Sequence, residues 1–302
     1  MSKSYVLYNP HAGNKTGAEK AEILKTVYPD KELYYLDITE ISDYAKFVGD
    51  LNEDDEIIIC GGDGTLNRFA NNIYDLNVKN NILYYATGTG NDFLRDLPDQ
   101  DGSMPFRINE YICDLPVVTV KGKDYRFING VGFGIDGYCC EVGDKLRAKE
   151  STKQINYAGI AIKGLLFYYK PTAATVTVDG ITHTYKKAWL APTMSGRYYG
   201  GGLMPTPHQT RDQRREHVSV GIIHDSGKLK TLMVFPSIFK GEHTKHTKMV
   251  DEFKGKNIKV EFDRPVALQI DGETILDVTS YEVSIAPVYK KEKMTENATV
   301  EA

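Results

Sequence analysis

The sequence predicts two domains of different class: an α/β domain with a parallel sheet over residues 1–105, and a β-sandwich domain over residues 106–289. Strand and helix patterns alternate in the first part, whereas β-branched and aromatic runs dominate the second. A chain of 302 residues is long for one hydrophobic core, and 41% hydrophobic residues suffice for two. The charged segment 290–302 is expected to be a tail, and whether it packs on the first domain is left open.

The first domain is predicted from four apolar runs, each followed by a helical pattern. The predicted strands cover residues 4–8, 32–36, 56–60 and 82–86, and the predicted helices cover 17–28, 41–51, 65–77 and 91–97. Such alternation favours a parallel sheet with helices on both faces.

The second domain is predicted from runs with the period of a half-buried strand. These runs cover residues 113–121, 125–130, 175–178, 181–191, 217–224, 256–262, 266–270 and 281–286. Asp179-Gly180 lies between two of them and predicts a two-residue hairpin. The segment Gly132–Gly137 satisfies G-x-G-x-x-G, but it lies in this β-rich half and lacks a βαβ unit, so we do not interpret it as a dinucleotide site.

A glycine-rich loop follows the third predicted strand. Gly61-Gly62-Asp63-Gly64-Thr65 leads directly into the helical pattern at 65–77. Glycines permit positive φ and close approach to a ligand, and the N-terminus of a helix favours a phosphate. The carboxylate of Asp63 would repel a phosphate unless a divalent cation or a transferring phosphoryl group lies between them. The loop therefore predicts a phosphate site with a metal.

Two further polar loops follow strands in the same way. Residues 9–13, Asn-Pro-His-Ala-Gly, come after the first strand, and residues 87–92, Thr-Gly-Thr-Gly-Asn-Asp, come after the fourth. Ligands in open α/β sheets bind beyond the carboxyl ends of the strands. We therefore expect the three loops to line one crevice.

Together, these three loops resemble the signature set of the diacylglycerol kinase catalytic-domain family, which is related to the sphingosine and ceramide kinases and distantly to the NAD kinases. The resemblance continues through Gly200–Gly202 and Gln269–Glu273, and it is closest to the soluble bacterial lipid kinases. It implies ATP- and Mg²⁺-dependent phosphorylation of a lipid hydroxyl, with diacylglycerol as the first expectation. Other acceptors (a sphingoid base, another glycerolipid or NAD) stay open, as does a nucleotide-binding regulator without turnover.

The resemblance also implies roles for individual residues. Those expected to bind the nucleotide are Asn9, Pro10, His11, Ala12, Gly13, Thr39, Gly62, Asp63, Gly64, Thr65, Leu66, Asn67, Arg68 and Thr89. Asp63 and Asp92 are expected to act in catalysis by organising Mg²⁺, through water molecules. Glu273 matches the position that accepts the proton in the bacterial lipid kinases. Because Glu273 comes from the second domain, the reaction is expected in the cleft between the domains.

Two positions depart from the family pattern. Arg68 stands where the family commonly has a glutamate, and its charge could contact phosphate or face solvent. The bacterial enzymes tend to hold a structural magnesium after their glycine triplet, but here residues 205–216 carry three arginines around Asp212. We therefore expect no structural metal at Asp212.

Composition bounds the partners and the cellular setting. The 37 Lys and Arg residues against 41 Asp and Glu give a net charge of −4, which argues against nucleic acid as a partner. The four cysteines form no C-x-x-C pair, and the polar N-terminus lacks a signal peptide, so a cytoplasmic protein is expected. No segment is long and apolar enough to span a membrane. A homodimer is left open.

A cytoplasmic lipid kinase would have to visit the inner membrane face transiently to reach a lipid substrate. Two segments combine apolar residues with lysines: 157–169, beside Lys163 and Lys170, and 232–248. This combination suits an anionic bilayer surface. Such stripes more often belong to helices packed on a sheet, so both interpretations are kept.

Overall fold

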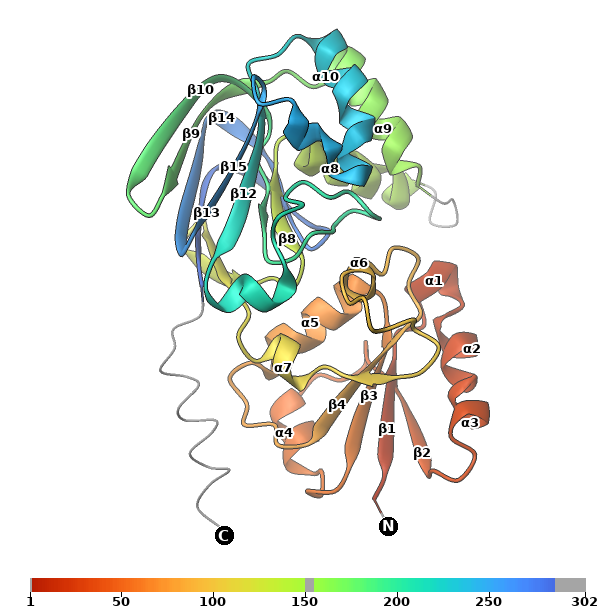
Figure 1. Cartoon of the computed structure of the whole chain (residues 1–302). Coiled ribbons are helices and arrows are strands. Elements are labelled where there is room, and N and C mark those ends of the chain that lie inside the picture. The colour runs from red at the N-terminus through yellow and green to blue at the C-terminus, as the bar shows by residue number, and fades with distance from the viewer. Residues whose placement is uncertain (1, 150–154, 286–302) are drawn as a thin grey trace. The chain divides into compact units, whose positions relative to one another are not determined.

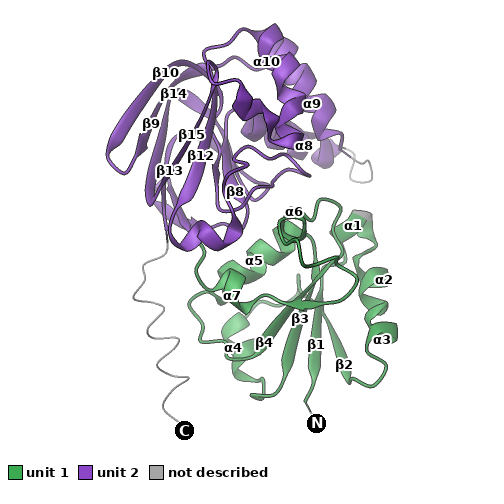
Figure 2. Cartoon of the chain, viewed as in Figure 1, with its two compact units in different colours: residues 1–115, 286–302 green, residues 116–285 purple. Residues whose placement is uncertain are grey.

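The computed structural model describes residues 2–149 and 155–285, which divide into two compact units (Figures 1 and 2). The first unit ends at Leu115 and the second covers Pro116–Ile285. The first unit thus continues past residue 105, where the sequence predicts the change of organisation, because a short strand at Phe106–Arg107 pairs with the sheet. The predicted tail, 290–302, lies outside the described residues.

The first unit is built on a five-stranded sheet in the order β2-β1-β3-β4-β5 (Figure 1). Its strands are β1 (Ser4–Tyr8), β2 (Leu33–Asp37), β3 (Glu56–Gly61), β4 (Asn81–Ala86) and β5 (Phe106–Arg107). The first four are parallel and lie within one residue of their predicted bounds, whereas β5 is antiparallel and was not predicted. Since β1 lies between β2 and β3, the chain reverses its direction across the sheet there. Ligands of open α/β sheets bind at such a switch point.

Seven short helices of the first unit lie in the described residues: α1 (Ala12–Lys15), α2 (Gly17–Glu22), α3 (Leu24–Val27), α4 (Tyr44–Gly49), α5 (Asp63–Ile73), α6 (Asp92–Arg95) and α7 (Asn109–Ile112). The helix predicted over 17–28 forms as two short helices in succession, α2 and α3, which meet at Ile23. In α5, Leu66, Phe69 and Ile73 are buried, as their spacing predicts.

The second unit contains a ten-stranded antiparallel sheet that folds over on itself. Its strands are β6 (Val117–Val120), β7 (Lys123–Arg126), β8 (Gly130–Phe133), β9 (Thr172–Val178), β10 (Ile181–Leu190), β11 (Thr193–Met194), β12 (Val218–His224), β13 (Val250–Gly255), β14 (Asn257–Ile270) and β15 (Glu273–Ser284). The predicted β-sandwich is confirmed in class. The predicted strand 113–121 begins only at Val117, and the predicted strand 125–130 falls largely between β7 and β8. The strands β8, β11 and β13 were not predicted.

The long strand β14 makes the fold-over, and it joins the two strands predicted at 256–262 and 266–270. Residues 258–262 pair with β9, whereas residues 268–270 pair with β8. The register is irregular between Glu261 and Val266, where Pro265 cannot donate a backbone hydrogen bond. Side chains from both layers fill the interior, where the rings of Phe133 and Phe262 stack at 4.0 Å.

Helices cover one side of this sandwich in Figure 1. They are α8 (Ile135–Lys149), α9 (Tyr157–Lys163) with its π-helical continuation η1 (Gly164–Tyr168), α10 (Lys228–Val234), and the 3₁₀ turns η3 (Phe235–Lys240) and η4 (Glu242–Lys245). A further 3₁₀ turn, η2 (Arg211–Arg215), lies at the end of the strands and precedes β12. A second apolar core, including Leu165, Trp189 and Ile238, lies between these helices and the sheet. Among the described residues, no helix combines the length and apolarity needed to cross a bilayer.

Candidate active site

The three glycine loops of the first unit lie together at the carboxyl ends of β1, β3 and β4. Asn9 Nδ2 of the first loop donates a hydrogen bond to Thr65 Oγ1 of the second at 2.9 Å. The second and third loops touch through their backbones, since a Cβ on Gly88 would lie 2.5 Å from Gly62 Cα. The backbone N–H of Thr87 also donates to Gly61 O at 2.9 Å. The loops therefore share one site beside the β1–β3 switch point.

Lys20 is a cation at these loops that the sequence analysis missed. Its Nζ donates to Thr87 O of the third loop at 2.8 Å. The same Nζ would lie 2.9 Å from a Cβ on Gly13, which has φ of +57°, so it also borders the first loop. Lys20 gives no sequence signal because it lies on α2, away from every glycine loop in the sequence.

Asp63 links two of the loops through its carboxylate. Its two oxygens accept the backbone N–H groups of Asp92 at 3.0 Å and Phe93 at 2.8 Å. These two bonds fix the carboxylate at the point where the second and third loops meet. The side chain of Asp92 is buried in the first turn of α6 and lies 3.8 Å from the guanidinium of Arg95. The described residues contain no group of three or more His, Cys, Asp or Glu side chains with metal-binding geometry.

The remaining predicted nucleotide residues differ in their exposure. Thr65, Leu66 and Asn67 are buried in the first turns of α5, whereas His11, Gly64, Arg68 and Thr89 are exposed, and Pro10 and Ala12 are half-buried. Thr39 follows β2, where its backbone N–H and hydroxyl both donate to Asp37 Oδ1 at 2.8 and 2.7 Å. Thr39 thus bonds within its own loop.

In the second unit, Glu273 begins β15 immediately after a tight hairpin turn. Asp271 and Gly272 form the turn with φ of +46° and +94°, and Ile270 pairs with Glu273. The carboxylate of Asp271 accepts the N–H groups of Ile128, Asn129 and Gly130 at 2.5 to 2.9 Å. These bonds fix the turn, so Glu273 is an exposed carboxylate on a rigid support.

The arginine-rich segment places a guanidinium beside the same backbone. Arg211 is buried, and its Nη1 and Nη2 donate to Ile128 O at 2.6 Å and Asn129 Oδ1 at 2.8 Å. A second buried arginine, Arg214, donates from Nη1 to Arg211 O at 2.9 Å. The segment around Asp212 therefore carries two buried guanidinium groups, and the absence of a structural metal there stays a prediction.

This arrangement predicts that chelation leaves the protein's thermal stability unchanged. Exhaustive chelation should not shift the melting temperature of the nucleotide-free protein, because guanidinium groups occupy this part of the fold. Arg211→Met should instead lower the free energy of unfolding by roughly 3 kcal/mol, as two charge-assisted hydrogen bonds are lost. Calorimetry with and without chelator measures both. A chelator-induced drop of several degrees that magnesium reverses would contradict the prediction.

A buried aspartate, Asp136, is the second feature that the sequence analysis missed. Asp136, in the first turn of α8, accepts the N–H of Gly137 at 2.9 Å and the hydroxyl of Tyr199 at 3.1 Å. Burial raises the pKa of Asp136 to about 6. A Cβ on Gly132 would lie 1.6 Å from Asp136 Oδ2, so the carboxyl group fills the space that this glycine leaves. Asp136 belongs to the G-x-G-x-x-G segment that was set aside.

The Asp136 cluster predicts a stability difference that depends on pH. The folded state favours the protonated acid, so this contribution is largest near pH 4 and is lost as the pH rises through about 6. A shift of about two units corresponds to about 3 kcal/mol. The free energy of unfolding of the wild type relative to Asp136→Asn should therefore fall by about that amount between pH 4 and 7. Urea titrations of both proteins measure it, and a difference independent of pH would be inconsistent with the buried acid.

A cavity of about 430 Å³ lies in the second unit. Tyr138 and Glu141 of α8, residues 168–170 after α9, residues 264–267 of β14, and residues 276–277 of β15 line it. Its wall combines aromatic and aliphatic surface with the charges of Lys170 and Arg264, and it includes the strand that Glu273 begins.

Comparisons with known proteins agree with this architecture. Residues 3–112 match the model of the diacylglycerol kinase catalytic domain, and residues 129–289 match that of the YegS C-terminal NAD kinase beta sandwich-like domain. The Bacillus subtilis protein named "Putative lipid kinase YtlR" is 22% identical over 95% of this chain and 98% of its own length. "Putative lipid kinase SERP0390" of Staphylococcus epidermidis is 27% identical over 82% and 80%.

A solved structure has the same fold. The structure titled "Crystal structure of a putative diacylglycerol kinase from Bacillus anthracis str. Sterne" superposes with a TM-score of 0.65 at 20% identity, covering 94% of each chain. A parallel α/β unit with converging glycine loops, followed by an antiparallel sandwich, defines the class of two-domain kinases with this fold. Within that class, the chain belongs to the diacylglycerol kinase catalytic-domain family with a YegS-type C-terminal domain, whose bacterial members bear lipid kinase names.

Proposed function

We propose that the protein is an ATP-dependent lipid kinase that transfers the γ-phosphate to a lipid hydroxyl, with diacylglycerol as the favoured acceptor. The observation that carries this proposal is the convergence of three polar glycine loops at the β1–β3 switch point, linked by Asn9, Thr65 and the Gly62–Gly88 contact. Membership of the diacylglycerol kinase catalytic-domain family supports it.

The first unit would bind the nucleotide. The backbones of residues 9–13 and 62–68 and of Thr89 would surround the phosphates, and the ammonium of Lys20 would lie beside them. Glycines at the contacts let the backbone come close to a ligand. Arg68 is exposed on α5, where its charge can contribute attraction for a polyphosphate.

Asp63 and Asp92 fit a hydrated magnesium ion that is shared with the phosphates. Their carboxylates supply the oxygen ligands that Mg²⁺ prefers, and Asp63 lies where two of the glycine loops meet. When bound, the ion would offset the negative charge of the β- and γ-phosphates. The chain's own contribution is to hold the two carboxylates in fixed positions, because Asp63 accepts the N–H of Asp92 itself.

Glu273 would accept the proton of the lipid hydroxyl. As the hydroxyl oxygen forms its bond to the γ-phosphorus, the bond from that phosphorus to the β–γ bridging oxygen breaks and ADP leaves. The 430 Å³ cavity, which shares β15 with Glu273, would take part of the acceptor against Tyr138 and Leu276. Its aromatic and aliphatic wall suits an acyl or sphingoid chain.

The proposal is tested by incubating the protein with labelled ATP, magnesium and a total lipid extract and identifying the labelled products. We expect one labelled lipid product whose identity names the acceptor, and no labelled lipid with Lys20→Met as a matched nucleotide-site variant. Purified diacylglycerol, a sphingoid base and NAD, assayed separately, distinguish the three acceptors. If ATP binds but no acceptor is labelled, the protein is a nucleotide-binding regulator and the proposal fails.

A further inference from the structure

The exposed apolar side chains of the second unit are concentrated on two neighbouring helical segments. Eleven large apolar side chains are exposed in the described part of the chain, and six of them lie on residues 157–170 or 228–240. The six are Ile162, Phe167, Tyr168, Leu229, Met233 and Phe239. We call this set the outer apolar face.

The outer apolar face does not result from a missing internal partner, because each segment already buries another side. In the first segment, Leu165 and Tyr169 are buried while Phe167 and Tyr168, between them, are 69% and 68% exposed. On α10, Thr231 is buried and bonded to Ser226, whereas Leu229 and Met233 are each 68% exposed. Leu229 and Met233 are four residues apart and share one side of the helix. Both segments therefore bury one set of apolar side chains and direct another set outward.

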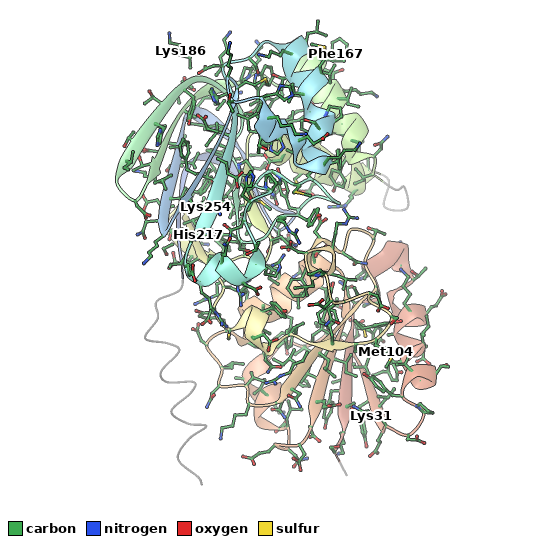
Figure 3. All side chains as sticks on the ribbon, viewed as in Figure 1. Lys31, Met104, Phe167, Lys186, His217 and Lys254 are labelled. Atoms are coloured by element: carbon green, nitrogen blue, oxygen red, sulfur yellow. The ribbon has the colours of Figure 1, made fainter. Side chains whose placement is uncertain are left out.

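The two segments are held side by side. Lys228 Nζ at the start of α10 donates to Leu166 O of η1 at 3.2 Å. Figure 1 shows α9 and α10 adjacent, and Figure 3 places Phe167 at their outer end. The two segments that carry the six side chains are thus neighbours in the second unit.

The charged residues around the outer apolar face indicate an anionic partner. Residues 157–170 and 228–240 contain no aspartate or glutamate, although the whole chain has a net charge of −4. The same residues carry five exposed lysines: Lys163, Lys170, Lys228, Lys230 and Lys240. Apolar side chains that reach into the acyl boundary, with lysines at headgroup level, are the combination that binds an anionic bilayer.

We propose that the outer apolar face is the surface by which this protein docks on an anionic lipid bilayer. Phe167, Tyr168, Leu229 and Met233 would enter the bilayer interface, and the five lysines would contact the anionic headgroups. The proposal rests on the proposed function in one respect: a kinase for a membrane lipid has to reach its substrate in the bilayer. Docking itself requires neither ATP nor turnover.

Vesicle co-sedimentation without nucleotide tests the docking surface. The wild-type chain should bind vesicles of equal parts phosphatidylglycerol and phosphatidylcholine. It should bind vesicles of phosphatidylcholine alone much more weakly. Phe167→Asp and Leu229→Asp should each weaken binding at least tenfold. Ile181→Asp is the matched control, because Ile181 is 67% exposed on the β9–β10 hairpin of the same unit. This variant should bind vesicles as the wild type does.

The contribution of the lysines to vesicle binding is tested with a second pair of variants. Lys163→Glu with Lys230→Glu should weaken binding to the anionic vesicles by at least about tenfold at low salt, with a smaller loss at high salt. Lys123→Glu with Lys186→Glu makes the same charge change at exposed positions of the same unit (Figure 3 labels Lys186) and should have little effect. Circular dichroism checks that every variant is folded.

Three results would overturn the proposal. The wild type could fail to sediment with anionic vesicles, or the Phe167 and Leu229 variants could bind as the wild type does. Alternatively, the wild type could be a dimer that Leu229→Asp converts to monomer without affecting vesicle binding, which would make the face a contact between two copies. Turnover on a short-chain acceptor dissolved in water separates this test from the proposed function. The docking variants should keep that turnover. If the wild type binds vesicles but phosphorylates no acceptor, only the proposed kinase function is refuted and the docking surface stands.

Discussion

Asp63→Asn should nearly abolish phosphoryl transfer, and the variant should also unfold at a lower temperature than the wild type. The amide removes the charge that a magnesium ion would require. It also presents an N–H₂ group to one of the two backbone N–H donors, at Asp92 or Phe93, so one hydrogen bond between the loops is lost. That loss should lower the free energy of unfolding by about 1–3 kcal/mol. Lipid phosphorylation at saturating ATP and a thermal melt measure the two effects.

The variant Asp43→Asn is a control that makes the same change from aspartate to asparagine at the N-terminus of a helix outside the glycine loops. Asp43 accepts the N–H of Lys46 at 2.9 Å at the start of α4 in the same unit, and asparagine caps helices about as well as aspartate. Asp43→Asn should therefore keep both turnover and melting temperature. If Asp63→Asn retains most of its activity at ordinary magnesium concentrations, Asp63 only organises the loops.

Glu273→Gln should lower the rate of lipid phosphorylation while the affinity for ATP barely changes. The amide keeps the size of the side chain but cannot accept a proton, and a positioned base contributes roughly 10²- to 10⁴-fold. The turn below it is held by the backbone N–H groups of residues 128–130 and does not depend on the Glu273 side chain. The nucleotide loops belong to the first unit, so ATP titration and turnover on the same variant report on different units.

Glu282→Gln provides the comparison for Glu273. Glu282 is exposed on the same strand, β15, and its carboxylate lies 3.5 Å from Lys259 Nζ, a surface pair that contributes little. This variant should turn over at the wild-type rate. An equal loss of ATP binding and turnover in Glu273→Gln would mean that Glu273 shapes the nucleotide site. A loss of neither would place the base elsewhere.

The parts of the fold that could be predicted are those with local signals. The four parallel strands of the first unit are short runs rich in apolar and aromatic residues. Both I′-type hairpins, at Asp179-Gly180 and Asp271-Gly272, carry the dipeptide that a positive φ requires. The strands β11 and β5 have two residues each, which is too short for any periodicity. They form only because longer neighbours offer them hydrogen-bond partners.

The parts of the site that escaped prediction depend on residues far apart in the sequence. Lys20 bonds to Thr87, and Arg211 bonds to Ile128 and Asn129, so neither pair follows from spacing. Burial decides the pKa of Asp136, and burial depends on the packing of Tyr199 above it. The exposure of Phe167 and Tyr168 also could not be resolved, because the π-helical turn at 164–168 shifts the phase of the apolar pattern.

The fold-over of β14 constrains the order in which a newly made chain can fold. All five strands of the first sheet have been synthesised by Arg107, so the first unit can fold early. In the second unit, β8 pairs with β14 and β6 pairs with β15, both among the last elements to be made. About 135 residues separate β8 from β14 and about 165 separate β6 from β15, which at typical rates of synthesis is on the order of ten seconds. β6 can pair with β7, and β8 with β11, before then. The other edge of each strand stays unpaired during that interval, and the growing chain has to be kept from pairing with other chains through these edges.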